Sequence, residues 1–192
     1  YTFAYVNGTL TISNKLEQTI TASDVTLTYG ETGKKIIATT SGDGAISYST
    51  TSDVISVAAD GTITALKAGT ATVTITAAET ADYAEATKTI SVTVNKATPN
   101  VTGVPTVADL VYDGTAQNLI NAGTTTDGEM QYSLDGTNYS PAIPTGTDAK
   151  TYTVWYKVVG DKNHNDTEPE KVEVSIAPKS ITVTADNASK TY

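Results

Sequence analysis

The sequence predicts an all-β fold made of two β-sandwiches in tandem, and three observations support this. Residues that favour strands, above all Thr, Val, Ile and Tyr, dominate the chain, whereas Phe, Met and Trp each occur once. Apolar and polar residues alternate with a period of two in many short runs, and no stretch has the spacing of an amphipathic helix. A strand that ends in a short, stiff joint recurs at nearly constant spacing, which indicates like-sized domains strung end to end.

The recurring joint is clearest at 92–99, where an alternating strand runs into Pro99. Proline cannot donate to a strand ladder and holds the preceding residue extended, so a strand ends here. The same pattern occurs at 10–15 and 174–179, and its lysines lie 81 and 83 residues apart, at Lys15, Lys96 and Lys179. Residues 15–96 and 97–178 are therefore predicted to be the two sandwiches.

The two ends of the chain are predicted to belong to neighbouring repeats. Residues 1–14 hold two alternating runs around Asn7-Gly8, the strongest hairpin signal, and are predicted to be the C-terminal hairpin of an upstream repeat. Residues 179–192 are predicted to be the first strand of a downstream repeat. Because the chain begins at Tyr1, we expect it to be a segment of a longer polypeptide.

Within 15–96 we expect eight short strands, separated by turns about every 8–12 residues, as in a sandwich or barrel. These predicted strands are 19–22, 25–29, 35–39, 45–49, 54–57, 62–66, 70–78 and 87–95. The predicted turns are Gly30–Gly33, Ser41–Gly44, Asp60-Gly61 and Lys67–Gly69.

Residues 97–178 repeat the plan. The predicted strands here are 101–104, 110–112, 117–120, 129–134, 151–159 and 171–176, and Asp-Gly turns lie at 113, 127 and 135. Aligning the two segments places 68–75 over 149–156, an offset of 81, and brings His164 close to Tyr83. The two segments are therefore predicted to share one fold.

Composition excludes several functions. The net charge is −9, and all twelve basic residues are lysines, so nucleic acid and anionic membrane surfaces are poor partners. No apolar run approaches the roughly 20 residues of a membrane helix. The absence of cysteine excludes disulfides, thiolate metal sites and cysteine nucleophiles, and we predict no cofactor and no metal.

The segment Asp148–Val154 resembles the start of strand F in immunoglobulin-like sandwiches. This resemblance makes Tyr152 the corner tyrosine and puts Val154 where antibody domains have cysteine. Ala71 stands at the place of Tyr152 in the first sandwich, so no corner hydrogen bond is expected there.

Residues 53–77 resemble the bacterial immunoglobulin-like group 2 domain, through a Val strand, the Asp60-Gly61 turn, a second strand, the turn at 68–71 and a long Val/Ile strand. That resemblance covers about 16–95. Residues 97–177 resemble a second immunoglobulin-like repeat of large bacterial surface proteins, through the segments 112–117, 132–136 and 159–165. The resemblances imply an extracellular position, at the cell surface or cell wall of a bacterium, in a tandem array that spaces or adheres. They imply no catalytic residue.

Three residues are candidate ligand contacts: Trp155, Tyr139 and His164. Alternation puts Tyr152, Val154, Tyr156 and Val158 on the core face of one strand, so Trp155 should point outward and could stack on a sugar together with Tyr139. Cover by a loop, or packing at a domain joint, is the alternative. His164 is the only histidine and is expected to be a loop residue at one end of a sandwich.

The loop at 161–168 has oxygen-bearing residues at alternate positions, as a calcium loop would, but Asp166 stands where an EF-hand needs glycine. A solvated hairpin loop is the better interpretation.

The predicted function is therefore a non-catalytic stalk or spacer whose partners are the neighbouring repeats of the same polypeptide. The alternative is a module that binds a host or cell-wall glycan or protein through Trp155. An enzyme ranks last, because the carboxylates lie only in turns and at strand ends.

Overall fold

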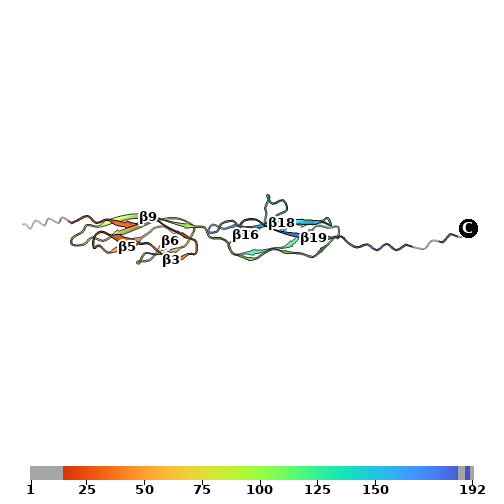
Figure 1. The fold of residues 1–192 in the computed structure, drawn as a ribbon, viewed down its shortest axis with the longest axis horizontal. Coiled ribbons are helices and arrows are strands. Elements are labelled where there is room, and N and C mark those ends of the chain that lie inside the picture. Colours follow the sequence, from red (N-terminus) through yellow and green to blue (C-terminus); the bar gives the residue numbers. More distant parts are fainter. Residues whose placement is uncertain (1–14, 186–188, 191–192) are drawn as a thin grey trace, which may run out of the picture. The chain divides into compact units, whose positions relative to one another are not determined.

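The computed structural model describes residues 15–185 and 189–190. The chain divides into two compact units, with the boundary between Lys96 and Ala97, here called unit 1 and unit 2. The described residues form strands and no helix, which confirms the all-β prediction (Figure 1). The hairpin predicted at 1–14 lies outside the described residues.

Unit 1 is an immunoglobulin-like sandwich built from a four-stranded sheet, a three-stranded sheet and one two-strand pair (Figure 1). The larger sheet has the order β2-β9-β8-β5, in which β2 runs parallel to β9 and the other neighbours are antiparallel. Its strands are β2 (Val25–Thr28), β5 (Ile46–Ser49), β8 (Gly69–Ala77) and β9 (Ala86–Asn95). Strand β2, near the start of the unit, pairs in parallel with β9, the last strand, and β5 forms the opposite edge of the sheet.

The second sheet of unit 1 has the order β3-β7-β6, and β1 pairs with β4. These strands are β1 (Ile20–Ala22), β3 (Thr32–Lys35), β4 (Ala38–Thr40), β6 (Ile55–Val57) and β7 (Thr62–Ala65). The turn predicted at Gly30–Gly33 is wrong in its second half, because β3 already begins at Thr32. Gly33 has a φ of 78° and lies where the register with β7 shifts, so it forms a bulge inside a strand.

The core of unit 1 follows the predicted alternation. In β8 every second side chain, from Ala71 to Ala77, is buried. Val92 of β9 is paired with Ala71 in the same sheet, and Ile63 of β7, in the other sheet, is buried in the same core. Each such burial stabilises the unit by roughly 1.5–3 kcal/mol for a Val or Ile side chain.

The larger sheet of unit 2 has the order β12-β19-β18-β16, again with a parallel pair, β12 with β19. Its strands are β12 (Leu110–Val111), β16 (Gly128–Ser133), β18 (Thr151–Gly160) and β19 (Glu170–Ala177). Val154, Tyr156 and Val158 are buried and Tyr152 packs beside them, which confirms the predicted core face of β18. Tyr152 also bonds to Asp148, which confirms it as the corner tyrosine.

The facing layer of unit 2 consists of three two-strand pairs. They are β10 (Val101–Gly103) with β15 (Thr124–Thr125), β11 (Thr106–Val107) with β14 (Ile120–Asn121), and β13 (Gln117–Asn118) with β17 (Thr145–Gly146). The sequence analysis did not predict β11, β15 and β17, and the single strand predicted at 117–120 is two short strands, β13 and β14.

The strand predicted at the start of 179–192 has no counterpart in the described residues. Residues 178–185 belong to no strand, and Ile181 and Val183 are each 83% exposed. That this segment opens a downstream repeat stays a prediction. Among the described residues, no helix has the length and apolarity to span a membrane.

Candidate functional site

The outer face of β18 carries Trp155, the first candidate ligand contact. Its cross-strand neighbours are Ser133 of β16 and Lys171 of β19. The indole is half-buried: the Lys171 Nζ atom lies 5.5 Å from the ring centroid, and the turn at Gly136 comes so close that a Cβ atom there would be 3.3 Å from the indole. Alternation therefore identified the face correctly, and a turn together with a lysine covers part of the ring.

The turn beside Trp155 is organised by Asp135. One carboxylate oxygen accepts the Ser133 hydroxyl at 2.7 Å and the N–H groups of Thr137 and Asn138 at 2.8 Å each. The other accepts the Asn138 side-chain amide at 2.6 Å. These hydrogen bonds, of which those from Asn138 have the largest effect, hold the pKa of Asp135 far below its usual range. The ionised aspartate thus fixes the shape of the turn that covers the indole.

Tyr139, the second candidate, lies on the same face of the sheet. The Lys157 Nζ atom is 4.9 Å from its ring centroid and 4.0 Å from an Asp166 carboxylate oxygen. The Tyr139 hydroxyl is buried and has no hydrogen-bond partner among the described residues. The structure therefore brings Trp155 and Tyr139 together on one face, each with a lysine over its ring. Such a face can stack on a flat ligand or attract an anionic one.

His164, the third candidate, lies elsewhere, in the loop between β18 and β19. Its Nδ1 atom is 2.7 Å from the Asp161 carboxylate and its Nε2 atom 3.8 Å from that of Asp127, and its side chain is only 12% exposed. Hydrogen bonds from Asn100 and Asn163 N–H groups are the main reason why the pKa values of Asp127 and Asp161 are lowered. His164 is therefore a loop residue packed at the end of the sandwich, as expected.

Two carboxylates of the loop at 161–168 are engaged by the loop itself or by the adjacent end of β18. Asp161 accepts the Asn163 N–H at 2.7 Å, and Asp166 accepts the Gly160 N–H at 3.0 Å. No group of three or more His, Cys, Asp or Glu residues in the described part of the chain is arranged to hold a metal ion.

A pair of backbone hydrogen bonds fastens the start of each unit to its own last hairpin loop, and we call it the N-terminal clamp. In unit 1, Leu16 donates to Asp82 and accepts from Ala84, at 2.8 and 2.9 Å. In unit 2, Ala97 donates to Asn163 and accepts from Asn165, at 2.9 and 2.8 Å. All three positions differ by 81 residues. The predicted alignment of His164 with Tyr83 is thereby confirmed, since these two residues bridge Ala97 and Leu16.

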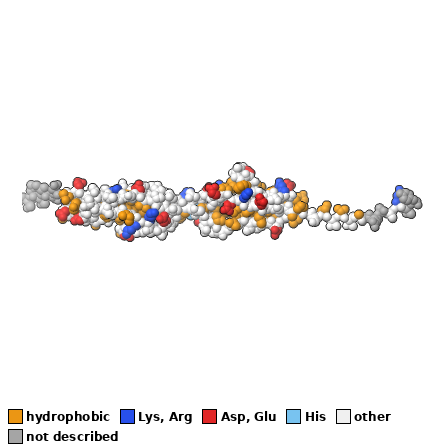
Figure 2. Space-filling model, in the orientation of Figure 1, with side chains coloured by type: hydrophobic (Ala, Val, Ile, Leu, Met, Phe, Trp, Pro, Cys, Tyr) orange, Lys and Arg blue, Asp and Glu red, His pale blue; other side chains and the backbone are white. Residues whose placement is uncertain are grey.

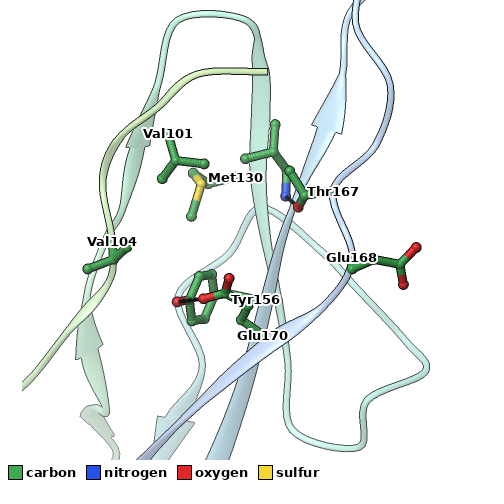
Figure 3. Close-up of a pocket in the computed structure, with 8 residues that line it drawn as sticks. Val101, Val104, Met130, Tyr156, Thr167, Glu168 and Glu170 are labelled. Carbon is green, nitrogen blue, oxygen red and sulfur yellow. Dashed lines mark hydrogen bonds between the residues drawn. The ribbon is translucent and has the colours of Figure 1, made fainter. Parts of the chain in front are cut away.

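A cavity of about 100 Å³ opens between β10 and the start of β19 (Figure 3). Its lining is mostly apolar: Val101, Val104, Met130, Tyr156 and Val158, with Thr167, Glu168 and Glu170. The Tyr156 hydroxyl donates to Glu170 at 2.5 Å. Burial of the phenol has the largest effect on its pKa and the neighbouring Glu170 the next largest, and together they raise the pKa of Tyr156 to about 12. The Glu168 carboxylate points away from the cavity (Figure 3). The phenol therefore stays protonated at neutral pH as a structural donor.

Apolar side chains also reach the surface of unit 2. Figure 2 shows them between small groups of acidic and basic side chains on one face of the molecule. The exposed large apolar residues of unit 2 before β18 are Val101, Val104, Val107, Val111, Tyr112 and Leu134. Their scatter over several short strands is usual for a small sandwich.

No protein-family model matches the sequence, and no curated protein matches it. Solved structures with a similar fold include Drosophila N-cadherin EC1-4, with 12% identity and a TM-score of 0.38 over 86% of this chain and 50% of that chain. Others are the Clostridium thermocellum CbhA fibronectin(III)-like modules, with 13% identity and a TM-score of 0.31 over 88% and 100%, and surface layer protein SbsC domains 1–6, with 17% and 0.32 over 85% and 28%. The chain thus spans half the length of the cadherin chain. At these identities the likeness concerns the fold alone.

Proposed function

We propose that the chain is a non-catalytic structural segment, a stalk or spacer, of a large bacterial surface protein. In this proposal unit 1 is a group 2 bacterial immunoglobulin-like repeat, unit 2 is a second immunoglobulin-like repeat, and both lie outside the cell. Their partners are the neighbouring repeats of the same polypeptide. Two sandwiches whose larger sheets have corresponding strand orders and which share the N-terminal clamp support a modular, repeated role.

The observation that carries the proposal is the length of the connection. Strand β9 ends at Asn95, and Ala97 is already held by the N-terminal clamp of unit 2. Only Lys96 lies between them. A single residue contributes two soft dihedral angles, so such a connection restricts bending far more than a flexible linker of several residues.

The acidic side chains support a structural role as well. Asp60, Asp113, Asp135 and Asp161 each accept the N–H of the residue two positions on. This is the turn-forming use of aspartate, and it lowers the pKa of all four. Carboxylates held ionised in turns are suited to fixing loops and poorly suited to general acid catalysis.

Spin-label distances test the proposal. The chain has no cysteine, so the double variant Ala59→Cys/Asn118→Cys places one label in each unit at exposed positions. We expect a narrow distance distribution in this variant and a broad one after four Gly/Ser residues are inserted behind Lys96. Equally broad distributions with and without the insertion would contradict a spacer with a stiff joint.

A second candidate function is binding of a glycan or protein by the outer face of β18. The observation that favours it is the juxtaposition of Trp155 and Tyr139 on that face. Titration with a glycan should then change the fluorescence of Trp155, the single tryptophan. Tyr139→Ala should weaken the change, and Tyr112→Ala, at the exposed residue that follows β12, should leave it intact. A glycan array without a hit would remove the glycan form of this candidate.

A further inference from the structure

The two units differ in how one edge of the larger sheet is finished. In unit 2 the edge strand is β16, and Tyr132 uses both of its outward backbone groups. Its N–H donates to the Ser140 carbonyl at 2.8 Å, and its carbonyl accepts the Ser140 N–H at 3.0 Å. The segment around Ser140 therefore caps this edge from within the unit, which protects it from other chains.

In unit 1 the equivalent edge strand is β5, and the equivalent residue is Tyr48. Tyr132 lies opposite Tyr156 of β18, and Tyr48 lies opposite Ile75 of β8, which is 81 residues earlier. Among residues 15–185 and 189–190, β8 is the only strand that pairs with β5 (labelled in Figure 1). Within residues 15–96, unit 1 thus leaves open the edge that unit 2 caps.

The register determines which backbone groups of β5 point outward. Ala78 donates its N–H to the Ala45 carbonyl at 3.0 Å, so this opposed pair is hydrogen-bonded. Bonded and non-bonded pairs alternate along an antiparallel ladder, so Ile46 and Tyr48 direct their N–H and C=O groups away from β8. The same alternation in unit 2 gives Tyr132 outward groups, which is where the Ser140 cap binds.

The open edge lacks the usual protection. Exposed edges are normally guarded by charged residues, proline or bulges. From Ala45 to Ser52 the chain has no charged residue and no proline, and the acidic residues Asp43 and Asp53 stand just outside. The edge is therefore an uncharged strand that can accept an extended segment with aliphatic side chains.

One described segment of the chain has this character. Ile181 and Val183 alternate with small polar residues, are each 83% exposed and belong to no strand, and Lys179 precedes them. We propose that the β5 edge of one copy binds residues 179–185 of a second copy as an added antiparallel strand. The proposal goes beyond the spacer role and is an alternative to the prediction that residues 179–192 open a downstream repeat.

The pairing has a consistent register. With Ile181 opposite Tyr48, Val183 falls opposite Ile46. Both then lie on the face of β5 whose side chains pack against the core of unit 1. Lys179 falls opposite Thr50, near Asp53, whose carboxylate already pairs with Lys67 of its own unit. Two exposed aliphatic side chains are thus covered.

Self-pairing of two β5 edges is the rival arrangement. Antiparallel pairing of two β5 edges would leave Ile181 and Val183, each 83% exposed, without cover. The edge–segment contact avoids this and is heterologous, so each copy keeps one free edge and one free segment, and association is open-ended.

Sedimentation velocity of the full 192-residue chain tests the proposal. We expect the weight-average mass to rise with concentration, and the variant Ile181→Asp/Val183→Asp to sediment as a monomer. The matched control Ile37→Asp/Val107→Asp replaces two other aliphatic residues, 73% and 51% exposed, and should still associate. A chain that is monomeric at every concentration, or association that survives Ile181→Asp/Val183→Asp, would overturn the proposal.

Amide exchange locates the contact. The exchange of Ile46 and Tyr48 amides should slow as the concentration of the chain rises. The amides of Ser47 and Ser49, which face β8, should not respond. An excess of a synthetic peptide with the sequence of residues 179–185 should dissociate the oligomer and keep the two outward amides protected. Unchanged exchange at Ile46 and Tyr48, despite a rising mass, would place the contact elsewhere and refute the proposal.

Discussion

The Tyr152 hydroxyl is bonded to both backbone groups of Asp148. The Asp148 N–H donates to it at 3.0 Å, and the hydroxyl donates to the Asp148 carbonyl at 3.2 Å. These two bonds close the turn ahead of β18, the strand that contributes Val154, Tyr156 and Val158 to the core of unit 2. In unit 1 the equivalent residue is Ala71, which is buried and has no hydroxyl. The corner is therefore a stabilising feature of unit 2 alone.

Tyr152→Phe should destabilise unit 2. The substitution removes both hydrogen bonds and keeps the ring, including its contact with Lys150 at 4.9 Å. We expect the free energy of unfolding to fall by about 1 kcal/mol, measured by urea denaturation. Tyr112→Phe, at an exposed tyrosine, is the matched control and should have little effect. Equal effects of the two variants would show that the corner bonds are not what stabilises the turn.

Tyr139→Phe should have the opposite effect from Tyr152→Phe and stabilise unit 2. The Tyr139 hydroxyl is buried without a hydrogen-bond partner among the described residues, and an unsatisfied buried polar group is costly. Its removal should raise the free energy of unfolding by about 1 kcal/mol in the same urea experiment. A loss of stability comparable to that of Tyr152→Phe would mean that the hydroxyl has a partner, such as an ordered water.

Ile75→Ala should affect unit 1 only. Ile75 is fully buried in the core of unit 1, and such truncations cost about 2–5 kcal/mol. Because each unit has its own core, calorimetry should resolve one transition that moves to lower temperature and one that stays. Ser56→Ala, at an exposed position of β6, is the control. A uniform shift of the whole unfolding profile would instead indicate that both units unfold as one.

Acid should destabilise both units. Hydrogen bonds, of which the one from the Thr62 N–H has the largest effect, lower the pKa of Asp60 to about 2. The pKa values of Asp113, Asp127 and Asp161 are lowered as well. A carboxylate whose pKa is depressed in the folded state stabilises that state above the unfolded value of 3.8 and loses this effect as the pH falls through the folded pKa. Stability should therefore drop between about pH 4 and pH 2.

The contribution of a single turn can be isolated with Asp135→Asn. This variant keeps the shape of the side chain and removes its charge, so the pH dependence of urea unfolding between pH 4 and 2 should become shallower. The same experiment on Asp109→Asn, at an aspartate with no such set of bonds, is the reference. An unchanged slope in Asp135→Asn would show that the turn bonds of Asp135 do not depend on its charge.

Sequence reasoning predicted the long strands well, because alternation is strong there. Strands β8, β9, β18 and β19 lie within about a residue of their predicted bounds. The same signal assigned the core face of β18, and the resemblance to strand F singled out Tyr152. Gly33 was misjudged because a glycine with positive φ serves a bulge as readily as a turn.

The features that were missed depend on tertiary contacts. No local pattern shows that the Asp135 turn folds beside Trp155, or that the Tyr139 hydroxyl is buried. The N-terminal clamp joins Ala97 to a loop more than sixty residues away, and only the 81-residue offset, applied to pairs of residues, could have revealed it. The cap on β16 escaped prediction for the same reason, since Ser140 pairs through its backbone and its side chain carries no signal.

Small-angle scattering of the full chain tests the central claim most directly. In the variant Ile181→Asp/Val183→Asp, which is expected to be monomeric, two like-sized sandwiches joined by Lys96 alone should scatter as an elongated particle, with a maximum dimension close to the summed lengths of the two units at every salt concentration. A compact particle, in which the two units pack side by side, would contradict the spacer.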